Sequence, residues 1–407
     1  MKVCHVARDI RASGGGEVVK QVARKMAQQD IEVVLITDTP SLDLGDGIRT
    51  IETPLGAKLL EWIPNSRSGW LLRHTLQIAV FTIMSSLIAL RFRWLGFLVF
   101  NHNCESLVGQ VLVMHNVFSA EFAARPLSRV QRIKALANPV RIMRISKEIL
   151  LSRPSFGRLL VSVSEGARPD VERLAGGSDR IYVIENGVDV RRFGQSNDLE
   201  VPLLVSDWKR ASGIDHAILF IGHEWKRKGL DELLIAISAL PSNCGLIVVG
   251  GTSQNRQLYD RKITELGIEP RVLFAGEWAD VRPFLAGSSI FCLPSHAETM
   301  PLVALEALAA GLPIVLTPEC PASGLIVEGL NGSVTNCIPL EIAQAIERTL
   351  SLGGGEANSE KIRSTVYQYD WDTVAKGYVD LVAEFCRSAR GPASRSSTQQ
   401  LEARNRR

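Results

Sequence analysis

Two glutamates, Glu298 and Glu306, stand at and just inside the start of a short predicted helix. Glu306 lies among alanines that let a neighbour approach closely, so we expect its carboxylate to be partly enclosed and to need donors such as sugar hydroxyls. At about 1.5 Å per residue the two carboxylates lie up to roughly 12 Å apart along the helix, a span that brackets a diphosphate. Free N–H groups at the helix start favour phosphate oxygens. The alternative is an amphipathic helix with two solvated glutamates.

Three consecutive cations form a second candidate cluster at the predicted start of another helix, Lys226, Arg227 and Lys228. Positive side chains at this point oppose the helix dipole, so a bound polyanion explains them better than fold stability does. A solvated loop is the alternative. Together with the two glutamates, these cations predict a pocket for a nucleotide diphosphate attached to a sugar.

Two further turns follow predicted strands. In a glycine run at 14–16, Gly15 and Gly16 permit close backbone approach to a ligand at a helix start. The run does not match the full dinucleotide-binding motif, so a plain tight turn remains open. His115 and Asn116 follow another strand, at the edge where open parallel sheets present ligand-binding residues. For His115 alone, a structural hydrogen bond is the other interpretation.

The elements that must position these residues alternate regularly between apolar strand-like runs and amphipathic helices. Pro301 suits the first turn of the helix that carries Glu306, and Gly311 suits its left-handed C-terminal cap. The alternation predicts an α/β fold with two Rossmann-like, parallel-sheet domains facing each other across a cleft. The predicted strands are 2–7, 31–37, 96–101, 108–115, 159–164, 181–184, 217–221, 245–249, 272–275, 290–293 and 313–317.

The composition is that of a soluble globular protein, with 407 residues, of which 46% are hydrophobic and 22% charged. A net charge of +3 is too small to imply a nucleic-acid partner. The seven cysteines have no paired or metal-type spacing and mostly fall in apolar runs, which indicates buried thiols in a reducing cytoplasm. Charges near the N-terminus interrupt any signal-peptide core, so we expect no export.

Two stretches of the first half suggest contact with a membrane surface. Residues 75–90 contain no charge but are shorter than the about 20 apolar residues of a bilayer span, so we expect a buried or interfacial helix. Residues 125–158 carry nine basic side chains against one acid, Glu148. Basic helices of this kind can bind anionic lipid or an anionic acceptor. The common alternative is that the basic side chains form only a solvated face of the protein. We therefore expect a peripheral protein on the inner, cytoplasmic face of the cytoplasmic membrane.

The chain resembles the retaining glycosyltransferases of family 4, with the B-type fold, and among them the lipopolysaccharide-core glucosyltransferases. The resemblance rests on the glycine turn, AsnGlyValAsp at 186–189 with Phe193, ArgLysGly at 227–229, and the run at 298–311. It implies transfer of a hexose from a nucleotide diphosphate sugar, by expectation a UDP-sugar, to a glycan or glycolipid acceptor. Cell-surface polysaccharide or lipopolysaccharide synthesis is the implied setting.

The resemblance also implies site residues. They are Arg227, Lys228, Gly15 and Gly16 for the diphosphate, Glu306 for the ribose, and Glu298, Thr299, Met300, Pro301 and Leu302 for the sugar. The implied catalytic residues are Glu298 and His115. Many members have an arginine where this chain has His223, which leaves Arg227 as the substitute. We expect no metal and no cofactor, because we find no pair of aspartates, one residue apart, placed to hold a metal against a diphosphate as in the other major glycosyltransferase fold. The basic cluster can then neutralise the leaving group.

The pattern along the chain divides it into parts, and the resemblance implies which part binds the donor and which the acceptor. Residues 1–193 are the predicted N-terminal, acceptor-side Rossmann-like domain, and residues 194–215, which lack a sustained period, are the predicted interdomain connector. Residues 216–370 are the predicted nucleotide-sugar-binding domain. Residues 371–387 are a predicted C-terminal helix that can cross back to the N-terminal domain, and 388–407 a predicted disordered tail.

Two other functions remain open. A nucleotide-sugar epimerase or a phosphorylase has a two-domain fold of this kind, and product analysis separates both from a transferase, which alone enlarges the acceptor. An inactive sugar-nucleotide-binding scaffold is the second alternative, against which the intact charged residues of the predicted pocket argue.

Overall fold

The computed structural model describes residues 1–10, 14–39, 44–53, 63, 66–124, 129–195, 199–251, 253–353 and 355–389. The chain forms two compact units, Met1–Leu112 with Trp371–Arg407, and Val113–Asp370. The boundaries predicted at 193 and 215 both fall inside the second unit, and the assignment of acceptor and donor domains stays a prediction. Beyond Ala389, the predicted tail lies outside the described residues.

The first sheet has seven strands in the order β3-β2-β1-β4-β5-β6-β7. Every pairing among β1 to β4, and that of β6 with β7, is parallel. Strand addition reverses direction at β1, whose neighbours are β2 and β4, as in doubly wound sheets. The strands are β1 Lys2–Val6, β2 Glu32–Thr37, β3 Ile48–Glu52, β4 Leu98–His102, β5 Val111–Met114, β6 Leu159–Ser162 and β7 Ile181–Val183. The sequence did not predict β3, a half-exposed edge strand.

The second sheet has six strands in the order β10-β9-β8-β11-β12-β13, and all of its pairings are parallel. Its strands are β8 His216–Ile221, β9 Cys244–Val249, β10 Val272–Gly276, β11 Ile290–Leu293, β12 Ile314–Leu316 and β13 Gly332–Val334. The apolar runs of β9, β11 and β12 are buried throughout, as expected of parallel strands covered on both faces. The prediction of two Rossmann-like parallel sheets is therefore confirmed.

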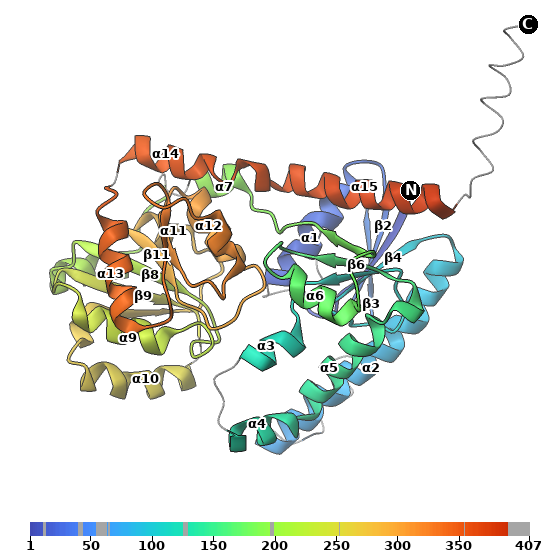
Figure 1. Cartoon of the computed structure of the whole chain (residues 1–407), viewed down its shortest axis with the longest axis horizontal. Helices are drawn as coiled ribbons and strands as arrows, with labels where there is room; N and C mark the ends of the chain where they lie inside the picture. The colour runs from blue at the N-terminus through green and yellow to red at the C-terminus, as the bar shows by residue number, and fades with distance from the viewer. Residues whose placement is uncertain are drawn as a thin grey trace, which may run out of the picture. The chain divides into compact units, whose positions relative to one another are not determined.

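Helices connect the strands of both sheets (Figure 1). The α-helices are α1 Gly14–Ala27, α2 Arg67–Trp94, α3 Phe118–Ala124, α4 Arg129–Leu136, α5 Pro139–Leu151, α6 Arg168–Ala175, α7 Val190–Gly194, α8 Leu203–Ser212, α9 Leu230–Ala239, α10 Ser253–Glu265, α11 Arg282–Ala286, α12 Leu302–Ala309, α13 Pro339–Leu350, α14 Glu356–Ser364 and α15 Trp371–Ala389. Short 3-10 helices are η2 Pro154–Phe156, η4 Glu269–Arg271, η5 Pro321–Leu325 and η6 Tyr367–Tyr369.

The predicted glycine turn is the first turn of α1, which begins at Gly14. A Cβ at Gly16 would lie 2.7 Å from Cα of Ile10, so this glycine is needed for close approach to the protein's own backbone. Gly15 is half-buried. The packing of Gly16 favours the tight-turn alternative, and the structure gives no separate evidence that either glycine binds a diphosphate.

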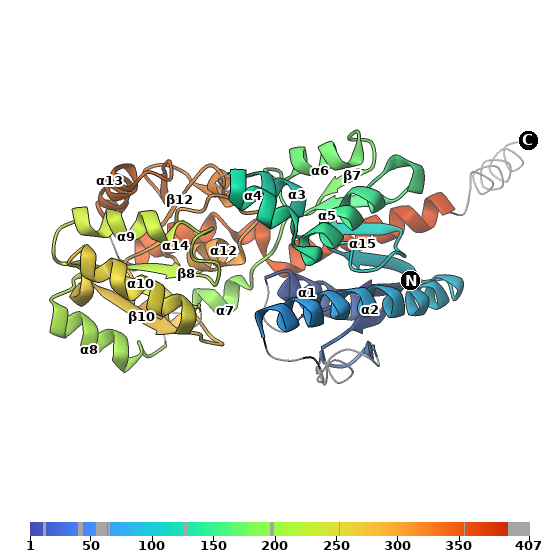
Figure 2. The ribbon, with the colours of Figure 1, turned by 90° about the horizontal axis from the view of Figure 1, so that it is seen from below.

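Helix α2, predicted as a buried or interfacial helix, has one face packed on the fold and one apolar face that is open. It runs unbroken from Arg67 to Trp94 (Figure 2). Ile83, Leu87 and Trp94 are 58%, 61% and 85% exposed, although Phe81 and Phe92 pack on β1 and β4. Among the described helices, Gly69–Trp94 alone is long and apolar enough to cross a membrane, and 33% of its most apolar window is buried.

The polar residues of α2 explain this inverted arrangement. The Ser86 hydroxyl accepts a hydrogen bond from the Leu107 N–H at 2.9 Å and lies 3.1 Å from the Ser106 hydroxyl. Ser85 and Thr82 are buried on the same side. Because these hydroxyls find partners within the fold, the helix buries its polar positions and leaves Ile83, Leu87 and Leu90 exposed.

The basic run at 125–158 is in part a packing surface rather than a solvated face. On α5, the Arg141 guanidinium lies 4.8 Å from the ring centre of Phe122, and Arg144 lies 5.1 Å from that of Phe118. The run's one acid, Glu148, is buried and accepts the N–H groups of Phe118 and Ser119, at 2.7 and 2.9 Å. These contacts hold α3 against α5.

The segment predicted as a connector without regular structure contains α8, Leu203–Ser212. Only Val205 is buried in this helix, so the apolar periodicity that would have predicted it is weak. Gly213, at φ +64°, ends it in the left-handed conformation. The predicted C-terminal helix is confirmed as α15, where Tyr378 is fully buried.

Candidate donor site

Helix α12 and the loop before it carry most of the predicted site. Its apolar face is buried as predicted, and Gly311 adopts φ +79° at the C-terminal end. Pro301 occupies the N-cap, so the helix begins at Leu302 and Pro301 lies outside its first turn. Glu306 is half-buried between the fully buried Ala304 and Ala307, which agrees with the predicted partial enclosure.

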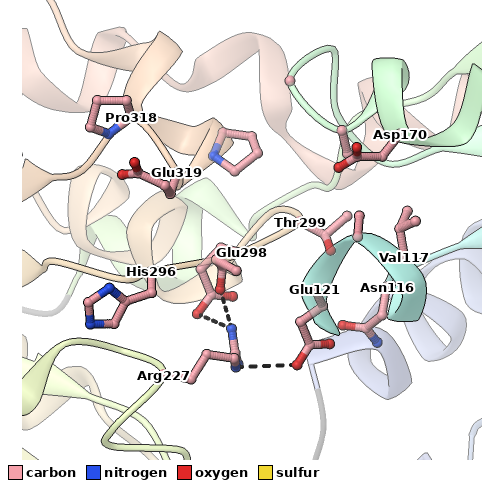
Figure 3. A pocket seen from close by; sticks show the side chains of 15 residues that line it. Asn116, Val117, Glu121, Asp170, Arg227, His296, Glu298, Thr299, Pro318 and Glu319 are labelled. Carbon is pink, nitrogen blue, oxygen red and sulfur yellow. Dashed lines mark hydrogen bonds and ion pairs between the residues drawn. The ribbon is translucent and has the colours of Figure 1, made fainter. Parts of the chain in front are cut away.

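Glu298 is the centre of a network of charged side chains (Figure 3). Its Oε1 lies 2.7 Å from Nζ of Lys228 and 3.0 Å from Nη1 of Arg227. The Ser295 hydroxyl donates to the same oxygen at 3.3 Å. The structure thus brings together three of the predicted site residues, which come from positions 70 residues apart in the chain.

The Arg227 guanidinium has further acidic partners. Its Nε lies 2.7 Å from Glu224 and 3.6 Å from Glu121 of α3, and its Nη1 donates to the Ala297 carbonyl. Because these carboxylates already balance the cations, a bound polyanion is not required to explain the cluster, contrary to the argument from the helix dipole alone. Lys226, the third predicted cation, is exposed.

Burial and charge act in opposite directions on this network. Burial alone would raise the pKa of Glu298, but Lys228 and Arg227 outweigh it and hold this pKa below its usual value. Burial would lower the pKa of Arg227, and Glu298, Glu224 and Glu121 together raise it above its usual value. Glu298 and Arg227 are therefore both charged at neutral pH, and the cluster can exchange an internal carboxylate for the phosphates of a ligand.

Two glycines make room for the cationic loop. The side chain of Lys228 crosses Gly222 so closely that a Cβ there would lie 2.2 Å from Cδ of the lysine. Gly229 adopts φ +75°, and its Cβ would lie 1.9 Å from the carbonyl oxygen of Pro294. The glycine of the ArgLysGly motif therefore lets the loop before α9 lie directly against the loop before α12.

Hydrogen bonds to its carbonyls hold the loop before α12. The Ser164 hydroxyl donates to the Thr299 carbonyl at 2.8 Å, and the Asn186 amide donates to the Met300 carbonyl at 3.1 Å. Asn186 begins the AsnGlyValAsp motif, so this motif positions the loop. Both carbonyls are therefore engaged within the fold.

A pocket of about 240 Å³ adjoins the network within the unit Val113–Asp370. Arg227, Glu298 and Thr299 line it, together with Asn116, which the sequence placed at a ligand-presenting strand edge, and Asp170, which the sequence did not single out. Figure 3 shows the side chains of Glu298 and Glu121 directed towards Arg227. The predicted residues that do not line this pocket are Lys228, His115, Met300, Pro301, Leu302 and Glu306, and Gly15 and Gly16 belong to the other unit.

His115 follows β5 and is 7% exposed. Burial lowers the pKa of its imidazole to about 4, so the ring is neutral at physiological pH. Its sequence neighbour Asn116 lines the pocket. A neutral imidazole at this point can exchange hydrogen bonds with a hydroxyl and adds no charge beside the cationic cluster.

Two residues near the pocket escaped sequence reasoning because their partners are distant in the chain. Glu121 gives no signal of its own until α3 is placed beside Arg227. The second residue is His296, which lines the pocket and whose pKa is lowered by burial but raised more by hydrogen bonds. Its hydrogen bonds to Cys337 and Glu232 raise the pKa of the ring to about 10.

The chain does contain one pair of aspartates that are one residue apart, Asp370 and Asp372, on either side of Trp371. Asp370 accepts a hydrogen bond from the Val190 N–H at 3.4 Å, and Asp372 lies 2.5 Å from Nζ of Lys25 on α1. Neither carboxylate lines the pocket. This run therefore supports the fold around α15 and α7.

Two family models match the chain. Residues 12–192 match the model described as glycosyltransferase family 4, and residues 215–352 match that of glycosyl transferases group 1. An uncharacterized glycosyltransferase of Methanocaldococcus jannaschii is 27% identical over 232 residues, or 54% of this chain and 59% of the relative. The lipopolysaccharide core biosynthesis glycosyltransferase LpsE of Rhizobium meliloti is 30% identical over 169 residues, or 41% of this chain and 49% of LpsE. The matched region thus spans about half the length of these curated relatives.

Solved structures show the same fold over nearly the whole chain. WaaG, described as a glycosyltransferase involved in lipopolysaccharide biosynthesis, aligns with a TM-score of 0.69 at 17% identity, covering 94% of this chain and 99% of WaaG. Anabaena HepE, solved in complex with UDP-glucose, aligns with a TM-score of 0.64 at 18% identity, covering 94% of this chain and 100% of HepE. The two parallel sheets and the two matching glycosyltransferase models give the chain the B-type glycosyltransferase fold, with residues 12–192 matching family 4, and the chain resembles the enzymes of the lipopolysaccharide core.

Proposed function

We propose that the protein transfers a hexose from a nucleotide diphosphate sugar to a glycan or glycolipid acceptor, with retention of anomeric configuration and without a metal. The observation that carries the proposal is the contact of Glu298 with both Arg227 and Lys228 beside the pocket. Two cations and a carboxylate at one point suit a ligand with an anionic diphosphate next to a hydroxyl-rich sugar. The names of LpsE and WaaG support an acceptor from lipopolysaccharide or another cell-surface glycan.

The roles of the residues follow from their charges. Arg227 and Lys228 bind the diphosphate and stabilise the negative charge that develops on the leaving group, which makes a metal unnecessary for this step. Glu298, released from these cations, accepts hydrogen bonds from the transferred sugar. Backbone groups of the loop from Thr299 to Leu302 contact sugar or phosphate, and Glu306 accepts the ribose hydroxyls. The UDP-glucose complex of HepE supports UDP as the nucleotide.

His115 completes the proposed catalytic pair with Glu298. Its neutral imidazole can accept or donate one hydrogen bond at a sugar hydroxyl on the reacting face. Gly15 and Gly16 are proposed to approach the diphosphate through their backbone N–H groups at the start of α1. This last role is the weaker one, because Gly16 is already required by the packing against Ile10.

The test is a donor panel followed by product analysis. UDP-, GDP- and ADP-sugars are compared by thermal shift, since a ligand at 100 times its Kd stabilises the folded state by about 2.7 kcal/mol. The stabilising donor is then incubated with lipopolysaccharide-core acceptors, and the product is identified by mass spectrometry and NMR. An enlarged acceptor with retained configuration supports the proposal. A changed donor sugar with no enlarged acceptor indicates an epimerase, release of sugar 1-phosphate indicates a phosphorylase, and donor binding without turnover indicates a scaffold.

Substitutions separate the two glutamates. Glu306→Ala raises the donor KM because it removes a contact made equally before and during transfer, whereas Glu298→Gln mainly lowers kcat. Equal, small effects of the two substitutions would show that neither carboxylate contacts the donor. Activity that does not depend on added Mg²⁺ supports transfer without a metal at the diphosphate.

We further propose that the protein binds the inner face of the cytoplasmic membrane as a peripheral protein. The exposed residues Ile83, Leu87 and Leu90 recur at spacings of three and four and so form one apolar stripe on α2. Arg91 and Arg93 flank the end of the stripe, and α2 contains no acidic residue. A helix of this charge suits a surface of anionic lipid, where each cation adds about 1 kcal/mol.

A further inference from the structure

Three side chains with the chemistry of metal ligands meet beneath the loop that carries Glu298. Glu232 comes from α9, His296 from the loop between β11 and α12, and Cys337 from the turn between β13 and α13. One ligand atom from each lies within 4.8 Å of the other two. Nε2 of His296 is 3.3 Å from Oε1 of Glu232 and 3.8 Å from Sγ of Cys337.

These separations suit one tetrahedral ion. Zinc binds nitrogen at about 2.0–2.1 Å, carboxylate oxygen at about 2.0–2.2 Å and thiolate sulfur at about 2.3 Å, so ligand atoms at tetrahedral angles lie roughly 3.4 to 3.6 Å apart. The nitrogen–oxygen separation already agrees with this spacing, and the nitrogen–sulfur separation must shorten by about 0.2 Å. The oxygen–sulfur separation is at most 4.8 Å, so rotation of the Glu232 and Cys337 side chains must bring these two atoms closer, by up to about 1.2 Å.

A hydrogen-bonded relay accounts for the cluster less well. In a relay, the thiol and the carboxylate would bond to opposite ring nitrogens, whereas here both converge on the same Nε2. Oε2 of Glu232 is buried and has no hydrogen-bond partner among the described residues. Convergence on one point and an unsatisfied carboxylate oxygen beside it are what a missing cation would leave.

We propose that Glu232, His296 and Cys337 form a site for a thiophilic divalent ion of the zinc type. A carboxylate, a neutral imidazole and a thiolate balance a doubly charged ion, and water supplies the fourth ligand. Binding releases the protons of the Cys337 thiol and the His296 imidazolium and replaces the hydrogen bond that the thiol donates to the Pro294 carbonyl at 3.0 Å.

The ion would act on the loop before α12 as a structural clamp. It would join three elements that no covalent link holds together, α9, the loop from Pro294 to Thr299, and the turn before α13. The backbone N–H of His296 donates to the Arg227 carbonyl at 2.9 Å, so the clamp also fixes the backbone of the cationic loop. The three metal ligands are not the residues assigned to the diphosphate. The metal site can therefore be tested independently of the transfer reaction.

The experiment uses the full chain, stripped with a chelator and dialysed, and titrated with Co²⁺ as a spectroscopic probe and then with Zn²⁺. We expect one Co²⁺ per chain with a thiolate-to-cobalt charge-transfer band in the near ultraviolet, displacement of Co²⁺ by Zn²⁺, and a higher Tm with Zn²⁺. Cys337→Ser should abolish the band and the shift in Tm, and His296→Gln should weaken binding at least tenfold.

Cys386→Ser is the matched control, because Cys386 is the other half-exposed cysteine and lies on α15. It should bind Co²⁺ as the unaltered chain does. The proposal is overturned if no thiolate band forms, or if the band survives Cys337→Ser, provided that the variants keep the circular dichroism spectrum of the unaltered chain. In either case the cluster is only an imidazolium paired with Glu232.

Discussion

At the scale of the residue, the carboxylate of Glu298 decides what the cationic cluster can bind. It lies within 3.0 Å of two cations, so a diphosphate must share those cations with it or displace it. Displacement is favourable only if the freed carboxylate finds new donors, and the hydroxyls of a sugar attached to the same diphosphate provide them. This coupling favours an intact donor over a free diphosphate.

Lys228 and Lys226 offer a direct comparison of a paired and a solvated cation. Lys228→Ala removes one charge-assisted hydrogen bond, of about 1.5 to 3 kcal/mol, and should weaken UDP binding by roughly 10- to 150-fold. The exposed Lys226→Ala is the control and should change affinity less than threefold. Isothermal titration calorimetry measures both. Equal affinities for the two variants would remove Lys228 from the diphosphate site.

His115 should make stability depend on pH. Burial lowers its pKa to about 4 in the folded protein, against an ordinary value of 6.5, so between these pH values the unfolded chain binds more protons. The free energy of unfolding therefore rises with pH across this window, by roughly 3 kcal/mol, and the contribution is complete above pH 6.5.

Urea unfolding at pH 7.0, 5.5 and 4.5 tests this expectation. His115→Asn cannot titrate and should lose this part of the pH dependence, whatever its stability at pH 7.0. The control is His223→Asn, whose side chain is 62% exposed. If His115→Asn and the unaltered chain lose the same stability on acidification, the buried imidazole is not the cause.

At the scale of the element, the two loops of the site depend on each other through Gly229. Gly229→Ala places a methyl group 1.9 Å from the Pro294 oxygen in addition to straining the left-handed backbone. We expect a loss of at least 3 kcal/mol in stability, because neither loop can yield without breaking the Glu298 contacts. Gly213 adopts φ +64°, and a Cβ added there would have no atom within 4 Å, so Gly213→Ala introduces backbone strain alone. This variant should lose about 1 kcal/mol of stability. Similar Tm values for the two variants would show that the loops move apart freely.

The pattern of apolar residues in the sequence predicted most helices and strands, but it did not predict the polar contacts between them. The apolar runs of β8, β9, β11 and β12 were recognised from the sequence because parallel strands are buried on both faces. Helix α8 was missed because it buries one side chain. For α2 the sequence left open which face is exposed, because its hydroxyls, not its leucines, face the fold. The length and hydropathy of a helix do not show which of its faces will form hydrogen bonds with a neighbouring loop.

The same limit applies to the site. Arg227, Lys228 and Glu298 could be predicted because a motif marks them, yet the contact among them could not, since it joins residues 70 positions apart. Glu121 and the cluster of Glu232, His296 and Cys337 belong to no motif. Such groups become visible only when the fold brings separate loops to one edge of a sheet.

At the scale of the whole molecule, the stripe on α2 predicts reversible attachment to lipid. The protein should sediment with anionic vesicles at low salt, not with neutral ones, and roughly 1 M salt should release it, because the screening length falls to about 3 Å. Leu87→Glu should abolish sedimentation. Leu203→Glu, at a leucine that is 79% exposed on α8, is the control and should leave it unchanged. If only detergent releases the protein from the vesicles, α2 inserts into the bilayer. If the protein binds neither kind of vesicle, the proposed attachment to the membrane is wrong.

The return of α15 to the first unit has a consequence for biosynthesis. The Lys25 ammonium on α1 pairs with Asp372, and Tyr378 is buried beside Phe100 of β4, so residues 371–389 complete a unit that begins at Met1. The ribosome makes these residues only after the whole of Val113–Asp370. Until then, the elements that α15 covers, among them α1 and β4, keep an apolar surface exposed. A stop codon at position 371 should therefore leave the first-made part of the chain as the substrate of chaperones and proteases.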